Sequence, residues 1–202
     1  MGTELELKYR LDDAAQLESV LSWQMLAVLR VGEPYTIRME TTYFDTPDGL
    51  FSARHRTVRR RMENGRSVFC VKTPCEGSAG GKLRREWEVE ANSFSEAAPR
   101  LAALGAPAEL AMLPEDALIP VCGAQFTRQA QLLRLSKDTL CELACDAGEL
   151  LGAKQTQPFF ELELELKEGR EADLQAFGQM LAVCFGLSVE PKSKFARARA
   201  LA

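Results

Sequence analysis

The pentapeptide ELELK occurs twice in this chain, at residues 4–8 and again at residues 163–167. In both copies charged residues alternate strictly with leucine. A β-strand points successive side chains to opposite faces, so this alternation places the charges on one face and the leucines on the other. The pattern therefore predicts two strands, near opposite ends of the chain, that each have one apolar and one charged face.

Strands of similar character fill most of the remaining sequence, and hairpin signals such as the Asn-Gly of ENGR separate several of them. The segments that the pattern predicts as strands are 4–11, 34–47, 56–63, 66–74, 82–91, 124–136, 139–150 and 159–169. Helical spacing predicts helices over 11–30, 93–105 and 170–187. Eight strands joined mostly by hairpins indicate an α+β fold with a large antiparallel sheet, and sheets of that size tend to curl or close.

Composition narrows the classes of function. The 202 residues suffice for one domain, which we expect to span 1–202. A net charge of −4 and the lack of a long apolar run argue against nucleic-acid and membrane partners. Six cysteines without a CxxC pair and a single histidine argue against a zinc site, and reduced thiols indicate a cytoplasmic protein.

Charges of one sign gather on single strand faces. The simplest interpretation is that every charged face is exposed to water, and this explains the pattern of any one strand considered alone. Like charges that pair directly across strands are destabilising, however, and helices are available to cover the leucine faces. We therefore expect these charged faces to turn inward together. They carry Glu4, Glu6, Lys8 and Arg10; Arg59 and Arg61; Arg84, Glu86, Glu88 and Glu90; Glu142 and Asp146; and Glu161, Glu163, Glu165 and Lys167.

An interior lined by arginines and glutamates has a large desolvation cost, so it would hold water and attract ligands that complete the charge pairing. Arginine and lysine suit phosphate oxygens. Carboxylates suit hard divalent cations such as Mg²⁺ or Mn²⁺. A phosphate chain together with such a cation satisfies both sets, and the residues favour a metal-dependent phosphate site.

Several segments, in order along nearly the whole chain, resemble the CYTH superfamily, the triphosphate tunnel metalloenzymes. ELELK at the N-terminus resembles the ExExK signature of that superfamily. The further matching segments are TTYFDTPDGLF, VRRRMENG, FCVKTP, RREWEVE, CELACDAGEL, FELELELKEG and KSKFARARAL. ExExK alone arises easily by chance, whereas the ordered series does not.

This resemblance implies a closed eight-stranded antiparallel β-barrel, or tunnel, with flanking helices, which binds a triphosphate and Mg²⁺ or Mn²⁺. The implied reaction is hydrolysis by in-line attack of water, with inorganic tripolyphosphate as the favoured substrate. Lys8, Arg59 and Arg61 are the implied catalytic residues. The implied substrate contacts are Lys8, Arg59, Arg61, Lys72, Arg84, Arg128 and Lys194. The implied metal ligands are Glu4, Glu6, Glu86, Glu88, Asp146, Glu161, Glu163 and Glu165, where Glu86 is the alternative to Glu88 and the register of the last three is left open.

Other activities fit the same resemblance. They are hydrolysis of nucleoside or thiamine triphosphates, cyclisation of ATP, and polyphosphate binding without turnover. The expected partner is a small polyanion, and a homodimer is compatible with the family. In the basic tail, the SKxxR match assigns a role to Lys194 but leaves Lys192, Arg197 and Arg199 undecided.

Overall fold

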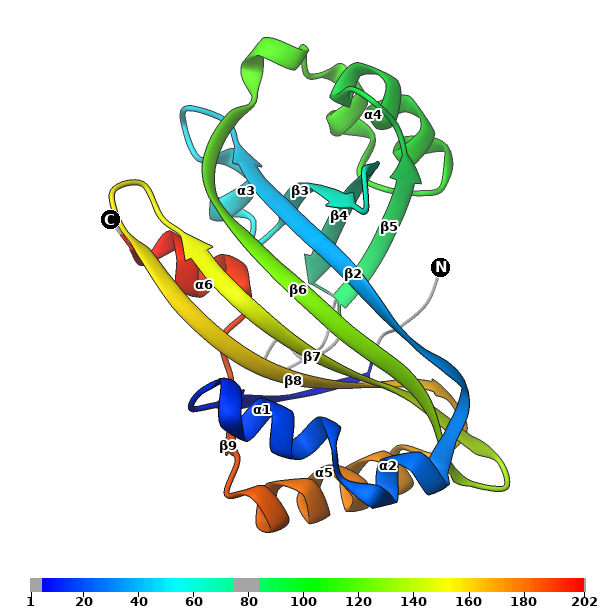
Figure 1. Ribbon diagram of the computed structural model, residues 1–202. Coiled ribbons are helices and arrows are strands. Elements are labelled where there is room, and N and C mark those ends of the chain that lie inside the picture. The colour runs from blue at the N-terminus through cyan, green and yellow to red at the C-terminus, as the bar shows by residue number, and fades with distance from the viewer. Residues whose placement is uncertain (1–4, 75–83, 202) are drawn as a thin grey trace.

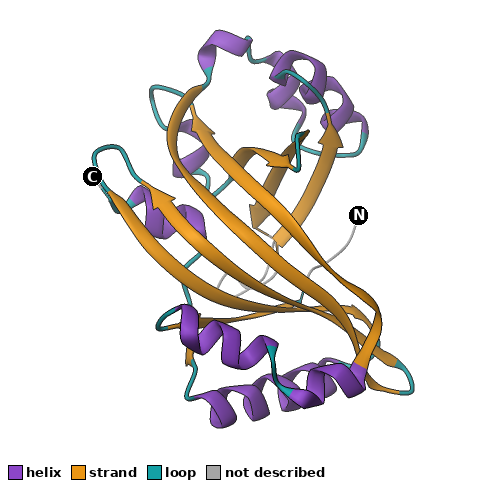
Figure 2. Ribbon diagram, in the orientation of Figure 1, coloured by secondary structure: helices purple, strands orange, loops and turns teal. Residues whose placement is uncertain are grey.

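The computed structural model describes residues 5–74 and 84–201. Its described strands form one antiparallel sheet with the order β5-β4-β3-β2-β6-β7-β8-β1-β9 (Figure 1, Figure 2). The strands are β1 (Glu6–Leu11), β2 (Arg30–Asp45), β3 (Thr57–Glu63), β4 (Arg66–Pro74), β5 (Arg84–Glu90), β6 (Ile119–Ser136), β7 (Thr139–Leu151), β8 (Thr156–Glu168) and β9 (Ser188–Val189). The antiparallel sheet with flanking helices confirms the predicted α+β architecture.

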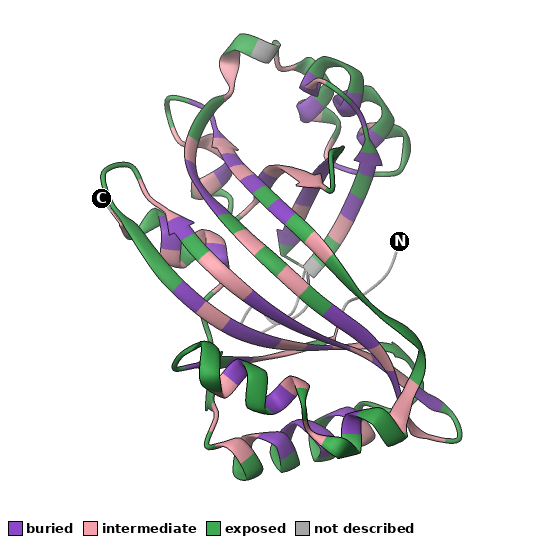
Figure 3. Ribbon diagram, in the orientation of Figure 1, coloured by how far each residue is buried: buried purple, intermediate pink, exposed green. Residues whose placement is uncertain are grey.

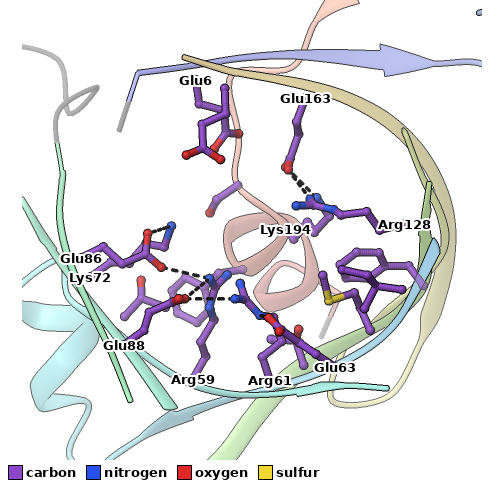
Figure 4. Close-up of a pocket in the computed structure, with 18 of the residues that line it drawn as sticks. Glu6, Arg59, Arg61, Glu63, Lys72, Glu86, Glu88, Arg128, Glu163 and Lys194 are labelled. Carbon is purple, nitrogen blue, oxygen red and sulfur yellow. Dashed lines mark hydrogen bonds and ion pairs between the residues drawn. The ribbon is translucent and has the colours of Figure 1, made fainter. Parts of the chain in front are cut away.

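The sheet curves strongly, so that its inner face surrounds a charged interior (Figure 4). Its two ends are β5 and the two-residue strand β9, and no pairing joins these strands within the described part of the chain. The described strands therefore make a curved nine-stranded sheet, and full closure into an eight-stranded barrel stays a prediction.

Leucines on the outer face of β1, β7 and β8 form the largest core. The helices α1 (Ala14–Leu21), α2 (Gln24–Leu29) and α5 (Glu171–Phe185) cover this face. The core contains the leucines of both ELELK-type strands, such as Leu7, Leu162 and Leu164. The helices thus bury the apolar side of the alternation and leave the charged side to the interior.

A second core lies on the outer face of β3, β4 and β5. It is covered by α3 (Leu50–Ala53), α4 (Phe94–Ala103) and the 3₁₀ segment Ala108–Met112, and a further 3₁₀ turn spans Glu115–Ala117. Trp87 and Val89 alternate with charged residues along β5, whereas residues 67–71 of β4 are all buried, as the burial colours of Figure 3 show.

The short helix α6 (Lys194–Arg199) packs across one end of the curved sheet (Figure 1). Ala198 and Phe195 contact Tyr43 and Phe159 in a third apolar cluster. Ser193 caps α6 by accepting a hydrogen bond from the Ala196 amide. This arrangement brings the first residues of α6 into the interior of the sheet.

Two local expectations need correction. The single helix predicted over 11–30 is two helices, because the backbone at Trp23 is extended and its ring packs against Phe177 and Phe185. The second predicted strand begins earlier, at Arg30, and passes through a bulge between Val31 and Tyr35. Among the described helices, none has the length and apolar character needed to cross a membrane.

Candidate active site

The inner face of the sheet lines a cavity of about 390 Å³ (Figure 4). Because side chains alternate along each strand, the odd-numbered residues of β2 and β3 and the even-numbered residues of β1, β4 and β5 face this cavity. Seven lysines or arginines and seven glutamates line it, so its formal charges balance. Most of them, together with two carboxylates directly behind the lining, form two groups on opposite sides, which we call the first wall and the second wall.

The first wall consists of Arg59, Arg61, Lys72, Glu86 and Glu88, on β3, β4 and β5. Arg59 lies 3.2 Å from Glu86 and 3.6 Å from Glu88, and Arg61 lies 3.1 Å from Glu88. Lys72 Nζ lies 2.5 Å from the second oxygen of Glu86. The cations of β3 and β4 therefore pair with the two carboxylates of β5.

The second wall consists of Lys8, Arg128, Asp146, Glu161, Glu163 and Lys194. Arg128 donates to both oxygens of Asp146, at 2.8 Å each, and also contacts Glu163. Lys194 reaches Asp146 and Glu163 at 2.8 Å and contacts Glu161 as well. Asp146 and Glu161 are fully buried, so this wall holds charges that only their ionic partners stabilise.

These contacts shift several pKa values. Burial alone would lower the pKa of Lys194, but Asp146, Glu163 and Glu161 outweigh it and raise that pKa well above its ordinary value. Burial alone would raise the pKa of Glu163, but Lys194, Arg128 and Lys8 hold it well below the ordinary value. Glu163 is therefore a carboxylate, and Lys194 an ammonium, across the usual working range of pH.

Glu161 differs from Glu163. Burial raises the pKa of Glu161, and the neighbouring Glu163 adds to this rise, although Lys194 opposes it. Glu161 is therefore the carboxyl group of the second wall whose negative charge its surroundings stabilise least, and a cation bound beside it would favour its charged form.

The same carboxylates fit a divalent metal ion. One oxygen each from Asp146, Glu161 and Glu163 lie within 4.8 Å of one another, and hard cations such as Mg²⁺ prefer oxygen ligands. Cys70, Glu86 and Glu88 form a second group of the same dimension on the first wall. The donor set of the second wall consists of oxygens alone, so it suits a hard divalent cation better.

The cavity also presents unused donor capacity. Nε of Arg59 is buried and has no hydrogen-bond partner within the described residues. A buried guanidinium N–H without an acceptor is costly, and a bound oxyanion would supply that acceptor. The first wall is therefore suited to an anion with several oxygens.

Most residues predicted for the site meet in this cavity. Those that line it are Glu6, Lys8, Arg59, Arg61, Lys72, Glu86, Glu88, Arg128, Glu163, Glu165 and Lys194. Asp146 and Glu161 lie directly behind this lining and reach the site through Lys194 and Arg128. Glu4 lies outside the described residues, and the side chain of Arg84, at the start of β5, is not described.

Several site residues were not assigned a role by the sequence. Arg197, left undecided in the tail, contacts Glu161 and lies 3.6 Å from Glu190. Tyr35, Glu142 and Lys167 gather at the end of the cavity away from α6, where the Tyr35 hydroxyl donates to Glu142. The parity of Glu142 and Lys167 was a usable signal, and Tyr35 shares the inward parity of Ile37 and Met39 but carries no charge that would have marked it.

This chain is similar to several known proteins in sequence and in structure. An inorganic triphosphatase from Haemophilus influenzae is 27% identical over 181 residues, which is 90% of this chain. The chain spans about half the length of that relative. A Hippeastrum protein, studied as an adenylyl cyclase and found to have a dominant triphosphatase activity, superposes with a TM-score of 0.64 at 18% identity, covering 98% of this chain and 96% of that one.

A Bacillus halodurans protein described as an adenylate cyclase gives a TM-score of 0.54 at 18% identity, with 96% of each chain covered. These two structures share the fold. The model of the CYTH domain matches residues 2–198, which is almost the full sequence. The chain therefore belongs to the CYTH domain family.

Proposed function

We propose that this protein hydrolyses a triphosphate in a metal-dependent reaction, with inorganic tripolyphosphate as its substrate. The observation that carries the proposal is that two groups of basic residues face each other across one cavity. They are Arg59, Arg61 and Lys72 on one side, and Lys8, Arg128 and Lys194 on the other. A linear chain of phosphates between these sides has basic groups within reach along its length.

The basic residues would bind and orient the phosphate oxygens. Arg59 and Arg61 would present planar guanidinium groups to a central or terminal phosphate, and Lys8 and Lys194 would neutralise its remaining charge. Phosphoryl transfer mainly requires positioning and charge stabilisation, so no protein nucleophile is needed. Water would attack the terminal phosphorus in line with the leaving oxygen, without a phosphoenzyme.

The carboxylates would hold the metal. Asp146, Glu161 and Glu163 form the described group that fits it, and Glu4, Glu6, Glu86, Glu88 and Glu165 complete the acidic set of the proposal. A bound Mg²⁺ or Mn²⁺ would supply charge stabilisation to a phosphoryl oxygen. A bound phosphate would attract Arg128 and Lys194 and so free the carboxylates that these side chains now neutralise. Because the freed carboxylates could then hold the metal, metal and substrate would bind cooperatively.

Three further features belong to the proposal. Residues 1–202 would form a single domain, in which the sheet closes fully into an eight-stranded tunnel around the substrate. The partner would be a small polyanion rather than a nucleic acid or a membrane. The protein would act in the cytoplasm.

The direct experiment is phosphate release from tripolyphosphate, thiamine triphosphate and ATP, each measured with Mg²⁺ and with Mn²⁺. The proposal expects the highest kcat/KM with tripolyphosphate and no turnover after metal chelation. Formation of cyclic AMP from ATP as the main reaction would favour a cyclase. Tight tripolyphosphate binding without phosphate release under either metal would favour a binding module.

A further inference from the structure

One thiol lies inside the charged cavity wall, and neither the proposed reaction nor the metal assignment uses it. Cys70 is on β4 between Arg59 of β3 and Glu88 of β5 in the strand register. It has the same parity as Lys72, two residues later, and its exposed fraction is 0%. The other described buried cysteines belong to the outer cores or to the contact with α6.

Cys70 contacts one of the carboxylates of the first wall. Its Sγ donates a hydrogen bond to Oε1 of Glu86 at 2.8 Å. The same oxygen accepts a hydrogen bond from Arg59 at 3.2 Å, and Lys72 lies 2.5 Å from the other oxygen of Glu86. The thiol therefore contacts the carboxylate through which Arg59 and Lys72 are joined.

The thiol is suited to act as a neutral donor. Cys70 is fully buried and its Sγ lies at hydrogen-bond distance from a carboxylate oxygen, an arrangement that a neutral S–H donor satisfies. A protonated thiol donates one hydrogen bond without adding a further charge to a wall whose carboxylates are already paired with cations. Sulfur is a soft ligand and suits a hard divalent cation poorly, so the group of Cys70, Glu86 and Glu88 does not require Cys70 as a metal ligand.

We infer that Cys70 is a positioning residue, which orients the Glu86 carboxylate and, through it, the guanidinium of Arg59 and the ammonium of Lys72 that face the substrate. This inference rests on the proposed function only for its expected effect on kcat/KM. The contact between Cys70 and Glu86 is independent of what the cavity binds.

The test is a double-mutant cycle of Cys70→Ala and Glu86→Gln, with Cys70→Ser as the conservative variant that retains a donor. We expect Cys70→Ala to lower kcat/KM for tripolyphosphate about tenfold, as expected for the loss of one hydrogen bond to a charged group. Cys70→Ser should restore most of this loss. In the Glu86→Gln background the same Cys70→Ala change should have little further effect, because the two residues act together.

The matched control is Cys141→Ala, which removes an equally buried thiol from the outer core. It should lower the midpoint of thermal unfolding without changing kcat/KM. Equal kcat/KM for the wild type and Cys70→Ala, or a tenfold loss that persists unchanged in the Glu86→Gln background, would overturn the inference.

A readout without turnover separates this inference from the proposed function. If the wild type releases no phosphate, the proposed function fails, and the same cycle is measured by the free energy of unfolding in urea. If the effects of the two substitutions on the free energy of unfolding are not additive, the contact between Cys70 and Glu86 is supported. Additive effects refute it.

Discussion

Arg128 holds Asp146 with two parallel hydrogen bonds, Nε to Oδ1 and Nη2 to Oδ2, each 2.8 Å long. The two residues are direct neighbours in the register of β6 and β7. Asp146 is fully buried, so this bidentate pair compensates a carboxylate that has no access to water. Arg128 thereby links a buried acidic residue to the cavity surface.

Arg128→Lys should be destabilising although it keeps the charge, because an ammonium lacks the planar fork that binds both oxygens of Asp146. We expect the free energy of unfolding to fall by about 2 kcal/mol, the scale of one hydrogen bond to a charged group. Urea denaturation measures this change. The control Arg134→Lys, on the exposed end of the same strand, should stay close to the wild type, and an equal loss in both variants would contradict the explanation.

The environment of Asp45 predicts that the fold becomes less stable at acid pH. Burial alone would raise the pKa of Asp45, but the Ser52 hydroxyl and the amides of Phe51, Thr46 and Ser52 donate to its carboxylate and lower that pKa below the ordinary value. A carboxylate with a lowered pKa stabilises the fold above its unfolded pKa of about 4, and this stability is lost as the pH falls further.

Asp45→Asn should therefore cost about 1–2 kcal/mol at neutral pH, because the amide replaces a charged acceptor with a neutral one. The loss should shrink as the pH falls from about 5 towards 2, where the wild type also becomes protonated. Thermal unfolding of both proteins across this range checks the prediction. A difference between them that does not change with pH would show that the charge of Asp45 contributes nothing.

Gly148 is predicted to tolerate no side chain. A Cβ at this position would collide with the carbonyl oxygen of Gln125 and lie 2.5 Å from Cα of Phe126, and these backbone atoms belong to a paired strand. We expect Gly148→Ala to destabilise the protein by about 2–3 kcal/mol, as overpacking does in a well-packed interior.

Gly178→Ala gives the comparison for Gly148→Ala. Its Cβ would meet only the ends of side chains, Tyr9 Oη at 2.5 Å and Leu7 Cδ1 at 2.8 Å, which can move. Alanine also favours the helix α5 by about 1 kcal/mol over glycine. Urea denaturation should therefore rank Gly148→Ala as clearly the less stable variant, and the reverse order would contradict the steric account.

We expect the apparent affinity for the metal to depend on Glu163. This carboxylate belongs to the group of oxygens suited to a metal, and it lies 3.7 Å from Lys8 and 2.8 Å from Lys194. Glu163→Gln keeps the shape but removes the negative charge. The concentration of Mn²⁺ that gives half of the maximal activity should rise at least about tenfold, a change of roughly 1.4 kcal/mol. Glu149→Gln, on the exposed part of β7, should leave it unchanged.

Much of this architecture was predictable because alternation along a strand is a local property. The parity of Glu6 and Lys8, and of Arg59 and Arg61, correctly placed these side chains on the inner face. How deeply an inward-facing side chain is buried depends on which distant parts of the chain pack against it. Asp146 and Glu161 are therefore fully buried behind the lining, a distinction that parity does not encode.

The contribution of α6 was harder to predict for the same reason. Arg197 contacts Glu161 because a six-residue helix packs across the end of the sheet, and the apolar contacts of Phe195 and Ala198 determine that packing. Pairing of a basic tail with a particular glutamate is a long-range event, and sequence periodicity reports only local structure. The break at Trp23 likewise depends on rings more than 150 residues away in the chain.

The central claim is that the charged cavity binds and hydrolyses a triphosphate, and neighbouring arginines on β3 test it most directly. Arg59 faces the cavity, whereas Arg60 lies on the opposite face and bonds to Ser67. In an assay of phosphate release from tripolyphosphate with Mg²⁺ or Mn²⁺, Arg59→Ala should lose at least about a hundredfold in kcat/KM, the scale of removing one preorganised donor that stabilises transition-state charge. Arg60→Ala should keep near wild-type activity. Equal activity of the two variants, or no phosphate release from the wild type with either metal, would contradict the claim.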